Sequence, residues 1–402
     1  DGLDVEYSVN VMDTVNPNKS TIIRMDDVDF RIKPVDLVVE GIDFGQSSNI
    51  EVSVNRIDAA GGVGPDSNLS PISSLKWTNN VGHALIRHVD LEIGGARINR
   101  LTSEWMDAEV ELTTPLDKLD GLNQMLGRFD DYDLLDPAKS THGGQKLYIP
   151  LTFSFCKTPG VAIPLLALQF HGVHLNFDFR DWNELIKSDV PVHSLIDVTN
   201  RAPRCIILPY VTFVYLGAQE RQKMANAPLE YLIQDVQFLG DVPIVFDGEE
   251  PALQRRIQID YAHPVSEIVW TYNASKTYNS ALSPSMYAVE GNDYFNYEAP
   301  AVVGGPDIDP VESGLIYING NRRFSERSGS YFRLVQPFQH HTRTPYKKVY
   351  CYSFALSPED ATPSGSLNFT RVDTSHLALT FPETFAEQRI SGRIRSYARS
   401  WN

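Results

Sequence analysis

The sequence predicts an all-β protein with two similar domains in tandem. Period-two alternation of apolar and polar residues recurs along the chain, whereas helical periodicity is scarce. The length of 402 residues exceeds the size at which a single sandwich core stops growing, so two domains of about 200 residues each are expected. A faint internal repeat agrees, because Phe155 aligns with Phe354 and Phe170 with Phe369 at one offset (354 − 155 and 369 − 170 are both 199).

Strands and tight turns can be placed in both halves. Residues 173–180 alternate apolar and polar without a fault, as a half-buried strand requires. Residues 89–93 do the same and run into Gly94-Gly95, which predicts a two-residue hairpin because paired glycines reach the positive φ of primed turns. Asn319-Gly320 after an apolar run predicts a second hairpin. Each half therefore has the strands and turns of a sandwich.

Few helices and two long loops complete this interpretation. Residues 218–225 are charged and are followed by Pro228, which predicts a linker helix between the domains. A second short helix is expected at about residues 101–112, which include Trp105. Residues 61–71 and 279–309 predict exposed loops, the second at one end of the second sandwich. A strand-like run is expected from Tyr148 to Phe155.

Charge and hydropathy exclude two kinds of partner. The formal net charge of −16 would repel a phosphate backbone, so no direct contact with nucleic acid is expected. No window of 18 uncharged apolar residues is present, so no segment is predicted to span a membrane. The one basic stretch is interpreted as a solvated strand face, and it contains Arg389, Arg393, Arg395 and Arg399.

Neither the cysteines nor the histidines form a recognisable site. Three cysteines without metal-type spacing predict buried free thiols in a reducing compartment (Cys156, Cys205 and Cys351). The histidine pairs are expected on diverging faces, where they cannot supply two imidazoles to one metal (His171 and His174, His340 and His341). An acidic run lacks calcium-loop spacing and is interpreted as a solvated loop (Asp130, Asp131, Asp133 and Asp136). We therefore predict no catalytic, cofactor-binding or metal-binding residues and no cofactor.

Ordered blocks across most of residues 77–368 resemble the major capsid proteins of nucleocytoplasmic large DNA viruses. In the first half, the blocks are residues 77–86, 91–95, 148–156 and 163–169. Residues 220–233 are similar to the family's junction between domains. In the second half, the blocks are residues 263–270, 323–324, 331–332, 335–337, 352–356 and 363–369.

The resemblance implies a double jelly roll, that is, two eight-stranded sandwiches with short linker and loop helices. It divides the chain into an N-terminal arm (1–24), a first jelly roll (25–217), a linker helix (218–228) and a second jelly roll (229–402). Residues 397–402 resemble the approach to the family's last strand, so we expect about ten further residues, roughly one strand, in the full-length protein. The usual arm of the family is not recognisable in residues 1–40.

The resemblance also implies a structural role without catalysis. Three chains would form a homotrimeric, pseudo-hexagonal capsomer of an icosahedral shell, assembled in the host cytoplasm and located in the virion. Neighbouring capsomers, penton proteins and minor capsid proteins would be its partners, with an internal membrane beneath the shell as a further candidate. Large aromatic residues are expected as core or interface anchors, namely Trp77, Trp105, Phe153, Phe155, Phe177, Trp270 and Phe354.

A tandem β-sandwich that binds or cleaves carbohydrate is the alternative function. Exposed aromatic side chains in the long second-half loop could stack on sugars, and Tyr294, Phe295 and Tyr297 are the candidates. Cleavage would require two carboxylates near a pocket, for which Glu290 and Asp293 are the candidates. Glycan binding by a monomer would favour this alternative.

Overall fold

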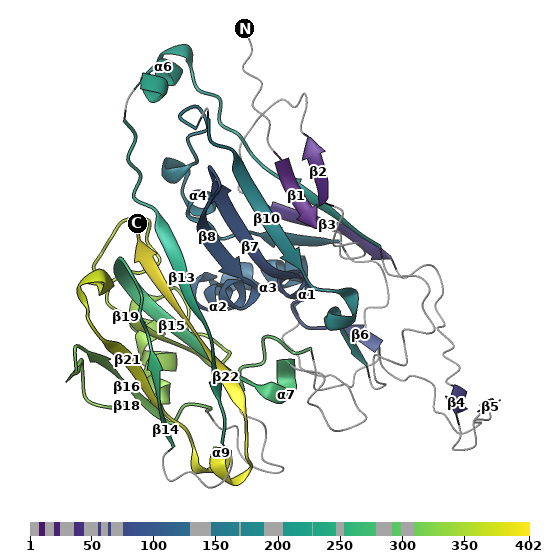
Figure 1. Ribbon diagram of the computed structural model, residues 1–402, viewed down its shortest axis with the longest axis vertical. Helices are drawn as coiled ribbons and strands as arrows, with labels where there is room; N and C mark the ends of the chain where they lie inside the picture. Colours follow the sequence, from purple (N-terminus) through teal and green to yellow (C-terminus); the bar gives the residue numbers. More distant parts are fainter. Residues whose placement is uncertain are drawn as a thin grey trace.

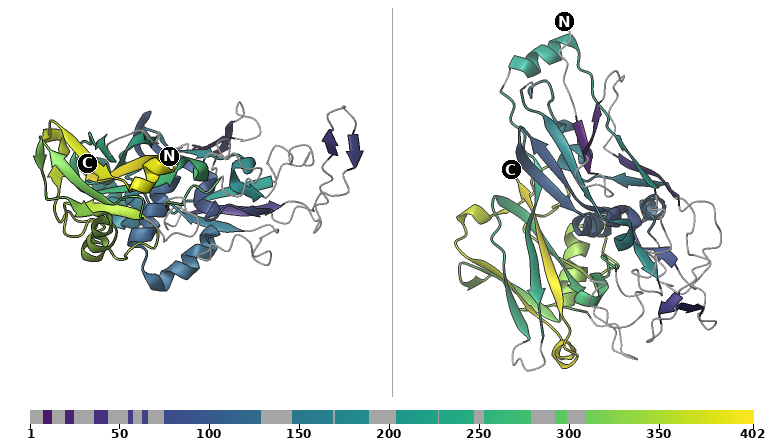
Figure 2. Two further views of the ribbon diagram at one scale, coloured as in Figure 1. Left: turned by 90° about the horizontal axis from the view of Figure 1, so that it is seen from below. Right: turned by 45° about the vertical axis from the view of Figure 1, so that its right-hand side comes forward.

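The chain folds into two β-rich regions that lie side by side (Figures 1 and 2). The computed structural model describes residues 8–12, 20–24, 36–43, 55–57, 63–65, 75–128, 146–168, 170–188, 204–226, 228–246, 253–278, 292–298 and 309–402. We call the region before helix α6 (Ala218–Asn226) the first sandwich and the region after it the second sandwich. No helix in the described part of the chain is long and apolar enough to cross a membrane.

The second sandwich consists of two antiparallel sheets that enclose their own core. The sheet nearer the first sandwich has the order β13-β22-β15-β19, with β20 paired to β15, and these strands are Gln234–Ile244, Gly392–Trp401, Pro264–Ala274, Val349–Ser353 and Leu367–Asn368. The other sheet has the order β14-β21-β16-β17, with β18 paired to β16, and these strands are Gln254–Gln258, Ser375–Thr380, Ser313–Ile318, Asn321–Arg322 and Arg327–Ser328. Short helical segments connect them, namely α7 (Ser275–Tyr278), η5 (Tyr331–Val335), α8 (Gln336–His340), η6 (Phe369–Arg371) and α9 (Glu383–Glu387).

Aromatic side chains fill the space between these two sheets. Trp270 at the centre of β15 contacts Phe332 at a ring-centroid distance of 5.2 Å and Tyr350 at 6.0 Å. Phe381 and Phe385 pack beside Tyr272. Edge-to-face and offset contacts of this kind add to the gain from burying the rings. Every fully buried member of this cluster comes from residues 244–398.

The first sandwich is less regular and contains more helix. Its largest sheet has the order β2-β1-β10-β7-β8, comprising Ser20–Arg24, Ser8–Met12, Val173–Phe179, Ile86–Ile93 and Ala96–Thr102. Smaller sheets pair β12, β3 and β9 (Arg204–Tyr210, Asp36–Asp43, Leu147–Pro150), β11 and β6 (Ile186–Ser188, Leu75–Trp77), and β4 and β5 (Asn55–Ile57, Val63–Pro65). Its helical segments are α1 (Val81–Leu85), α2 (Ser103–Thr113), α3 (Leu116–Leu126), α4 (Ser154–Lys157), η2 (Pro159–Val161) and η3 (Trp182–Leu185).

The predicted hairpins and helices are confirmed. Gly94 and Gly95 turn between β7 and β8 with φ of 61° and 83°, and Asn319 and Gly320 turn between β16 and β17 with φ of 50° and 76°. Helix α2 begins two residues after the predicted start, and α6 ends before Pro228. The strand predicted at residues 173–180 is β10, whose inward side chains include Phe177.

Other expectations were wrong in detail. The strand that begins near Tyr148 ends at Pro150, and Phe155 lies in α4, where it is half-buried because it packs only at the margin of the core. Phe170 is 93% exposed in a turn, whereas Phe369 is buried, so the 199-residue offset does not join equivalent positions. The predicted loop at residues 61–71 contains β5. Of the predicted anchors, Phe354 is also only half-buried, and five are buried as expected: Trp77, Trp105, Phe153, Phe177 and Trp270.

Candidate functional site

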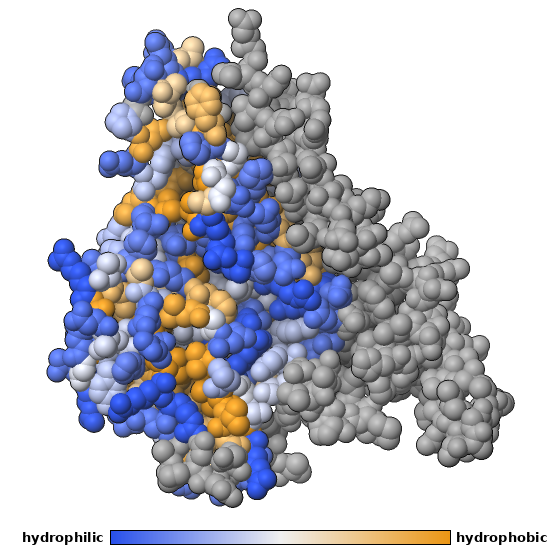
Figure 3. Space-filling view, in the orientation of Figure 1, coloured by the Kyte–Doolittle hydropathy of each residue, from blue (hydrophilic) through white to orange (hydrophobic). Residues whose placement is uncertain are grey.

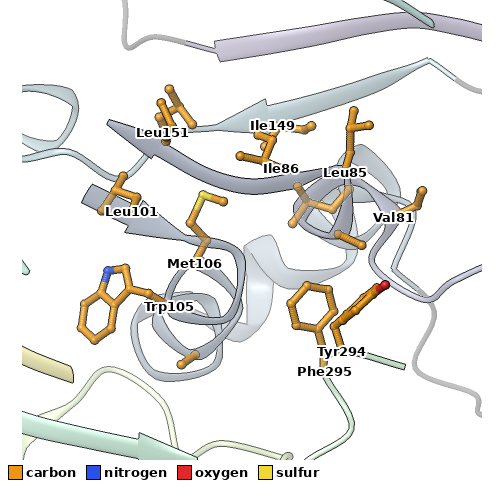
Figure 4. Packing of buried hydrophobic residues seen from close by; sticks show 14 of the residues in the cluster. Val81, Leu85, Ile86, Leu101, Trp105, Met106, Ile149, Leu151, Tyr294 and Phe295 are labelled. Atoms are coloured by element: carbon orange, nitrogen blue, oxygen red, sulfur yellow. The ribbon is translucent and has the colours of Figure 1, made fainter. Parts of the chain in front are cut away.

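Helix α2 belongs to the first sandwich and packs directly against the second (Figures 1 and 4). Thr102 caps its N-terminus by accepting a hydrogen bond from the Trp105 backbone N–H. Trp105 packs on Tyr397 of β22 at a ring-centroid distance of 5.4 Å, and the Thr102 and Tyr397 hydroxyl oxygens lie 3.0 Å apart. The helix therefore forms the junction between the two sandwiches.

This helix carries four carboxylates into a buried layer. Glu104, Asp107, Glu109 and Glu111 are each at most 2% exposed. A buried carboxylate without a partner would cost several kcal/mol, so each requires compensating cations. The geometry supplies one cation or more from each sandwich to every one of the four.

Glu104 lies at the N-terminal end of this layer. From the first sandwich, an Arg180 nitrogen lies 3.4 Å from Glu104 Oε1. From the second, Arg393 lies 3.6 Å from the same oxygen, and Arg395 pairs with Oε2. Burial alone would raise the pKa of Glu104, but Arg395, Arg180 and Arg393 together lower it to about 2. Glu104 is therefore ionised over the whole physiological range.

Asp107 and Glu111 share one cation of the first sandwich, Arg128. An Arg128 nitrogen lies 3.9 Å from Asp107 Oδ1, and another pairs with Glu111 Oε1. From the second sandwich, Lys347 Nζ donates to both Asp107 oxygens at 2.8 and 2.9 Å, and Arg343 lies 3.1 Å from Glu111 Oε2. Burial alone would raise the pKa of Asp107, but Lys347 and Arg128 lower it.

Glu109 connects the junction to a deeper network. It pairs with Lys157 of the first sandwich and lies 3.5 Å from Arg399 of β22. Arg399 also pairs with Glu267 of β15 at 2.6 Å, and another oxygen of Glu267 lies 2.8 Å from His341 Nε2 in a second ion pair. This chain of charges runs from α2 across the near sheet of the second sandwich.

His341 is held as an imidazolium by this network. Its Nδ1 lies 2.8 Å from Glu359 Oε1, so both ring nitrogens face carboxylate oxygens and both must carry protons. Burial alone would lower the pKa of His341, but Glu267 raises it well above its usual value. The neighbouring His340 interacts with the Leu356 carbonyl through Nδ1 at 2.9 Å.

The structure corrects the interpretation of the basic C-terminal stretch. Arg393, Arg395 and Arg399 lie on one face of β22 and point at α2, where their side chains are at most 13% exposed. Only Arg389 is exposed. The arginines are buried because β22 is a central strand covered by an acidic helix. The alternating arginines together with the acids of residues 104–111 were the signal in the sequence for this pairing.

The aromatic residues proposed to stack on sugars are also buried. Tyr294, Phe295 and Tyr297 are at most 7% exposed, and all three belong to the core cluster of the first sandwich. Figure 4 shows Tyr294 and Phe295 beside residues of α1 and α2. Asp293 is 5% exposed, while Glu290 lies outside the described residues. The exposed-aromatic basis of the carbohydrate alternative was therefore wrong.

The remaining candidate residues give no site. Cys156 and Cys351 form no disulfide, and Cys351 is buried while Cys156 is half-buried. His174 lies in β10, and His171 precedes that strand and is exposed. Within the described ranges, no group of three or more His, Cys, Asp or Glu residues is arranged to hold a metal ion. The acidic run (Asp130, Asp131, Asp133 and Asp136) and the Cys205 side chain lie outside the described residues.

Similar backbones in solved structures identify the fold. A quasi-atomic model of the PBCV-1 virus capsid aligns with a TM-score of 0.69 and 24% identity, covering 99% of this chain and 92% of that chain. The Faustovirus major capsid protein aligns with a TM-score of 0.66 and 11% identity, covering 98% and 89%. The fold is therefore that of the double jelly-roll capsid proteins, as predicted.

Sequence comparisons identify the family. Residues 31–217 match the model described as major capsid protein N-terminus, and residues 220–402 match the large eukaryotic DNA virus major capsid protein model. The major capsid protein of Pyramimonas orientalis virus is 31% identical over 336 residues, covering 78% of this chain and 73% of the relative. That of Paramecium bursaria Chlorella virus 1 is 32% identical over 311 residues, covering 74% and 67%. The chain belongs to the family of large eukaryotic DNA virus major capsid proteins, the structural components of the virion capsid.

Proposed function

We propose that three copies of this chain form a pseudo-hexagonal capsomer, the repeating unit of an icosahedral shell. Two sandwiches per chain supply six similar sandwiches per trimer, which suits a six-sided unit. Each copy would make the same heterologous contact with the next copy, and three such contacts close a ring. The proposal assigns the chain no catalytic role.

The observation that carries this proposal is the junction at α2. A capsomer can transmit load across a shell only if the two sandwiches of each chain keep a fixed relative orientation. Each of the four buried carboxylates pairs with cations of both sandwiches. One relative orientation is therefore favoured, because a shift of one sandwich against the other would leave buried charges without partners. Such a chain behaves as one rigid building block.

The remaining partners and boundaries belong to the same proposal. Neighbouring capsomers, penton proteins and minor capsid proteins would contact the trimer, with an internal membrane beneath the shell as a further candidate partner. Assembly would take place in the host cytoplasm. We also propose domain boundaries at residues 25, 218 and 229. The matched family models meet near residue 218, which supports the second boundary, and the proposed arm supplies β1 and β2, which extend the sheet of the first sandwich at β10.

Light scattering coupled to size-exclusion chromatography, followed by negative-stain microscopy, tests the capsomer. We expect a mass of three chains and particles with threefold symmetry and a six-sided outline. A monomeric mass at every protein concentration, with two-lobed particles, would contradict the proposal. Binding to a glycan array by such monomers would instead revive the carbohydrate function.

A further inference from the structure

The helical segment formed by η5 and α8 has apolar side chains on two opposite sides. On the inner side, Phe332 is fully buried against Trp270. On the outer side, Leu334 and Val335 are each 40% exposed and Phe338 is 81% exposed. A helix that is apolar on both sides belongs in an interior rather than on a surface. The outer side therefore has the character of a face that another molecule covers.

Leu356 extends this face beyond the helix. The carbonyl of Leu356 lies 2.9 Å from His340 Nδ1, which holds Leu356 beside the end of α8, and its side chain is 74% exposed. We call Leu334, Val335, Phe338 and Leu356 the apolar side patch. Single exposed apolar residues are ordinary, but neighbouring ones on one surface indicate an interaction site.

Charged groups at the border of the patch are compensated within the chain. Arg333 lies 3.1 Å from Asp309, and Glu359 is paired with His341. Glu359 also accepts from the Thr342 hydroxyl at 2.5 Å. These ion pairs can be covered by a partner without leaving a new unpaired charge, which is the costly event at interfaces.

An uncharged face suits a second copy of this chain as the occupant. Each copy carries a formal charge of −16, so two copies repel one another, and a contact without uncompensated acids adds least to this repulsion. The apolar side patch contains no charged side chain. Because the chain belongs to a family of major capsid proteins, a further copy of itself is the neighbour expected in the largest number. On the face shown in Figure 3, the apolar side chains near α6 lie among polar ones.

We propose that the apolar side patch docks onto a neighbouring copy and forms one half of the contact that closes the trimer. This inference rests on the proposed capsomer. Phe338 is the central anchor, because large aromatic side chains that become fully desolvated dominate the energetics of interfaces. Leu356 and the two outer residues of η5 surround it.

Charge substitution tests the patch directly. In Phe338→Asp and Leu356→Asp, docking would bury an unpaired carboxylate, so we expect the trimer dissociation constant to rise by about tenfold or more. Phe170→Asp is the matched control, because Phe170 is 93% exposed and lies in the first sandwich outside the patch. Unchanged melting of a dilute monomeric fraction verifies that each variant folds. Trimers of normal stability in both patch variants would overturn the inference.

Photo-crosslinking identifies the occupant. A benzoylphenylalanine placed at position 338 in a mixture of isotopically light and heavy chains should yield light-heavy crosslinked peptides. Crosslinks only within one chain, or only to a different protein in purified virions, would contradict a second copy. If the unmodified protein is not a trimer, the proposed capsomer fails; if it is a trimer and the patch variants remain so, only this inference fails.

Discussion

The two sandwiches bury their side chains in different ways. Among the described residues, the core of the second sandwich is self-contained, since its fully buried members all come from residues 244–398. The core of the first sandwich is shared: it includes Phe295 and Tyr297 from the second-half segment, and Tyr397 from β22. The same asymmetry appears in the charges, because α2 supplies acids and the second sandwich supplies many of their cations.

This difference indicates that the two sandwiches do not depend equally on one another for stability. In the described residues, the second sandwich has two five-stranded sheets around an aromatic core, whereas the core of the first includes residues from the second. The stability of the first sandwich should therefore depend on the second more than the reverse. The predictions that follow test this asymmetry, beginning with the largest expected effect.

Removing a charge from the junction should cause the largest loss of stability. Arg399→Met removes the cation shared by Glu109 and Glu267, and both acids are at most 2% exposed, so we expect the free energy of unfolding to fall by about 3–5 kcal/mol. Arg389→Met in the same basic stretch is the control. It should change the free energy of unfolding by less than about 0.5 kcal/mol, because Arg389 is exposed. Urea unfolding measures both, and equal effects would contradict the buried junction.

Truncating one aromatic residue in each core should distinguish the two cores. Phe295→Ala and Phe385→Ala each remove a nearly fully buried ring and should each cost about 3–5 kcal/mol. Hydrogen exchange should then locate the damage. We expect Phe295→Ala to accelerate exchange in α1 and α2, and Phe385→Ala to accelerate it in the second sandwich. Faster exchange confined to the second sandwich in both variants would show that Phe295 does not support the first core.

The two buried histidines should respond to pH in opposite directions. Burial lowers the pKa of His83 in α1 to about 4, against the pull of Asp107. Between the unfolded pKa of about 6.5 and this value, the unfolded state binds more protons, so acidification should remove up to about 3 kcal/mol of stability. His341 has a raised pKa, so its contribution is complete below about pH 6.5 and is lost as pH rises through the folded value.

Melting temperatures from about pH 4 to about pH 9 measure these contributions. In His83→Gln, the fall of the melting temperature toward acid pH should become smaller. In His341→Gln, the fall toward alkaline pH should become smaller. Hydrogen exchange of the intact protein should show acid loosening first in α1 and α2, and alkaline loosening first around β15 and the Glu359 segment. If one histidine variant removed both the acid and the alkaline fall in melting temperature, the two falls would not arise from different histidines.

The smallest expected effect compares the two hairpins. Gly320→Ala places a side chain at a φ of 76° in open space, so it should cost about 1 kcal/mol. Gly94→Ala should cost somewhat more, because its Cβ would lie 2.5 Å from His171 Cδ2 and the ring would have to move. Thermal melting of the two glycine variants measures which one loses more stability. A larger loss at Gly320 would mean that His171 imposes no steric restraint on the first hairpin.

The sequence predicted local structure better than long-range partners. Alternation along β10, the paired turn residues and the polar helix α6 are each determined by neighbouring residues, and all three were predicted correctly. The fold was predicted from the family resemblance, which single-strand patterns could not provide. The end of β9 was missed, because Phe153 and Phe155 continue a strand pattern although the chain turns into α4 after Pro150.

The junction was not predicted, because its partners are far apart in the sequence. Glu109 and Arg399 are separated by most of the chain, and an alternating basic strand looks the same whether it faces water or a buried acidic helix. The aromatic residues of the 292–298 segment were interpreted as exposed for the same reason. Loop composition indicates a connection between strands, but it does not reveal that the loop enters the core of the other domain.

Hydrogen exchange in increasing urea tests most directly whether the two sandwiches form one cooperative block. The most protected amides of α2 in the first sandwich and of β15 in the second should converge on one unfolding free energy and one urea dependence, since loss of either sandwich strands the charges of the other. If α2 opened fully while β15 and β21 kept their protection to about 1 M more urea, the sandwiches would be separate units and the junction would not join them.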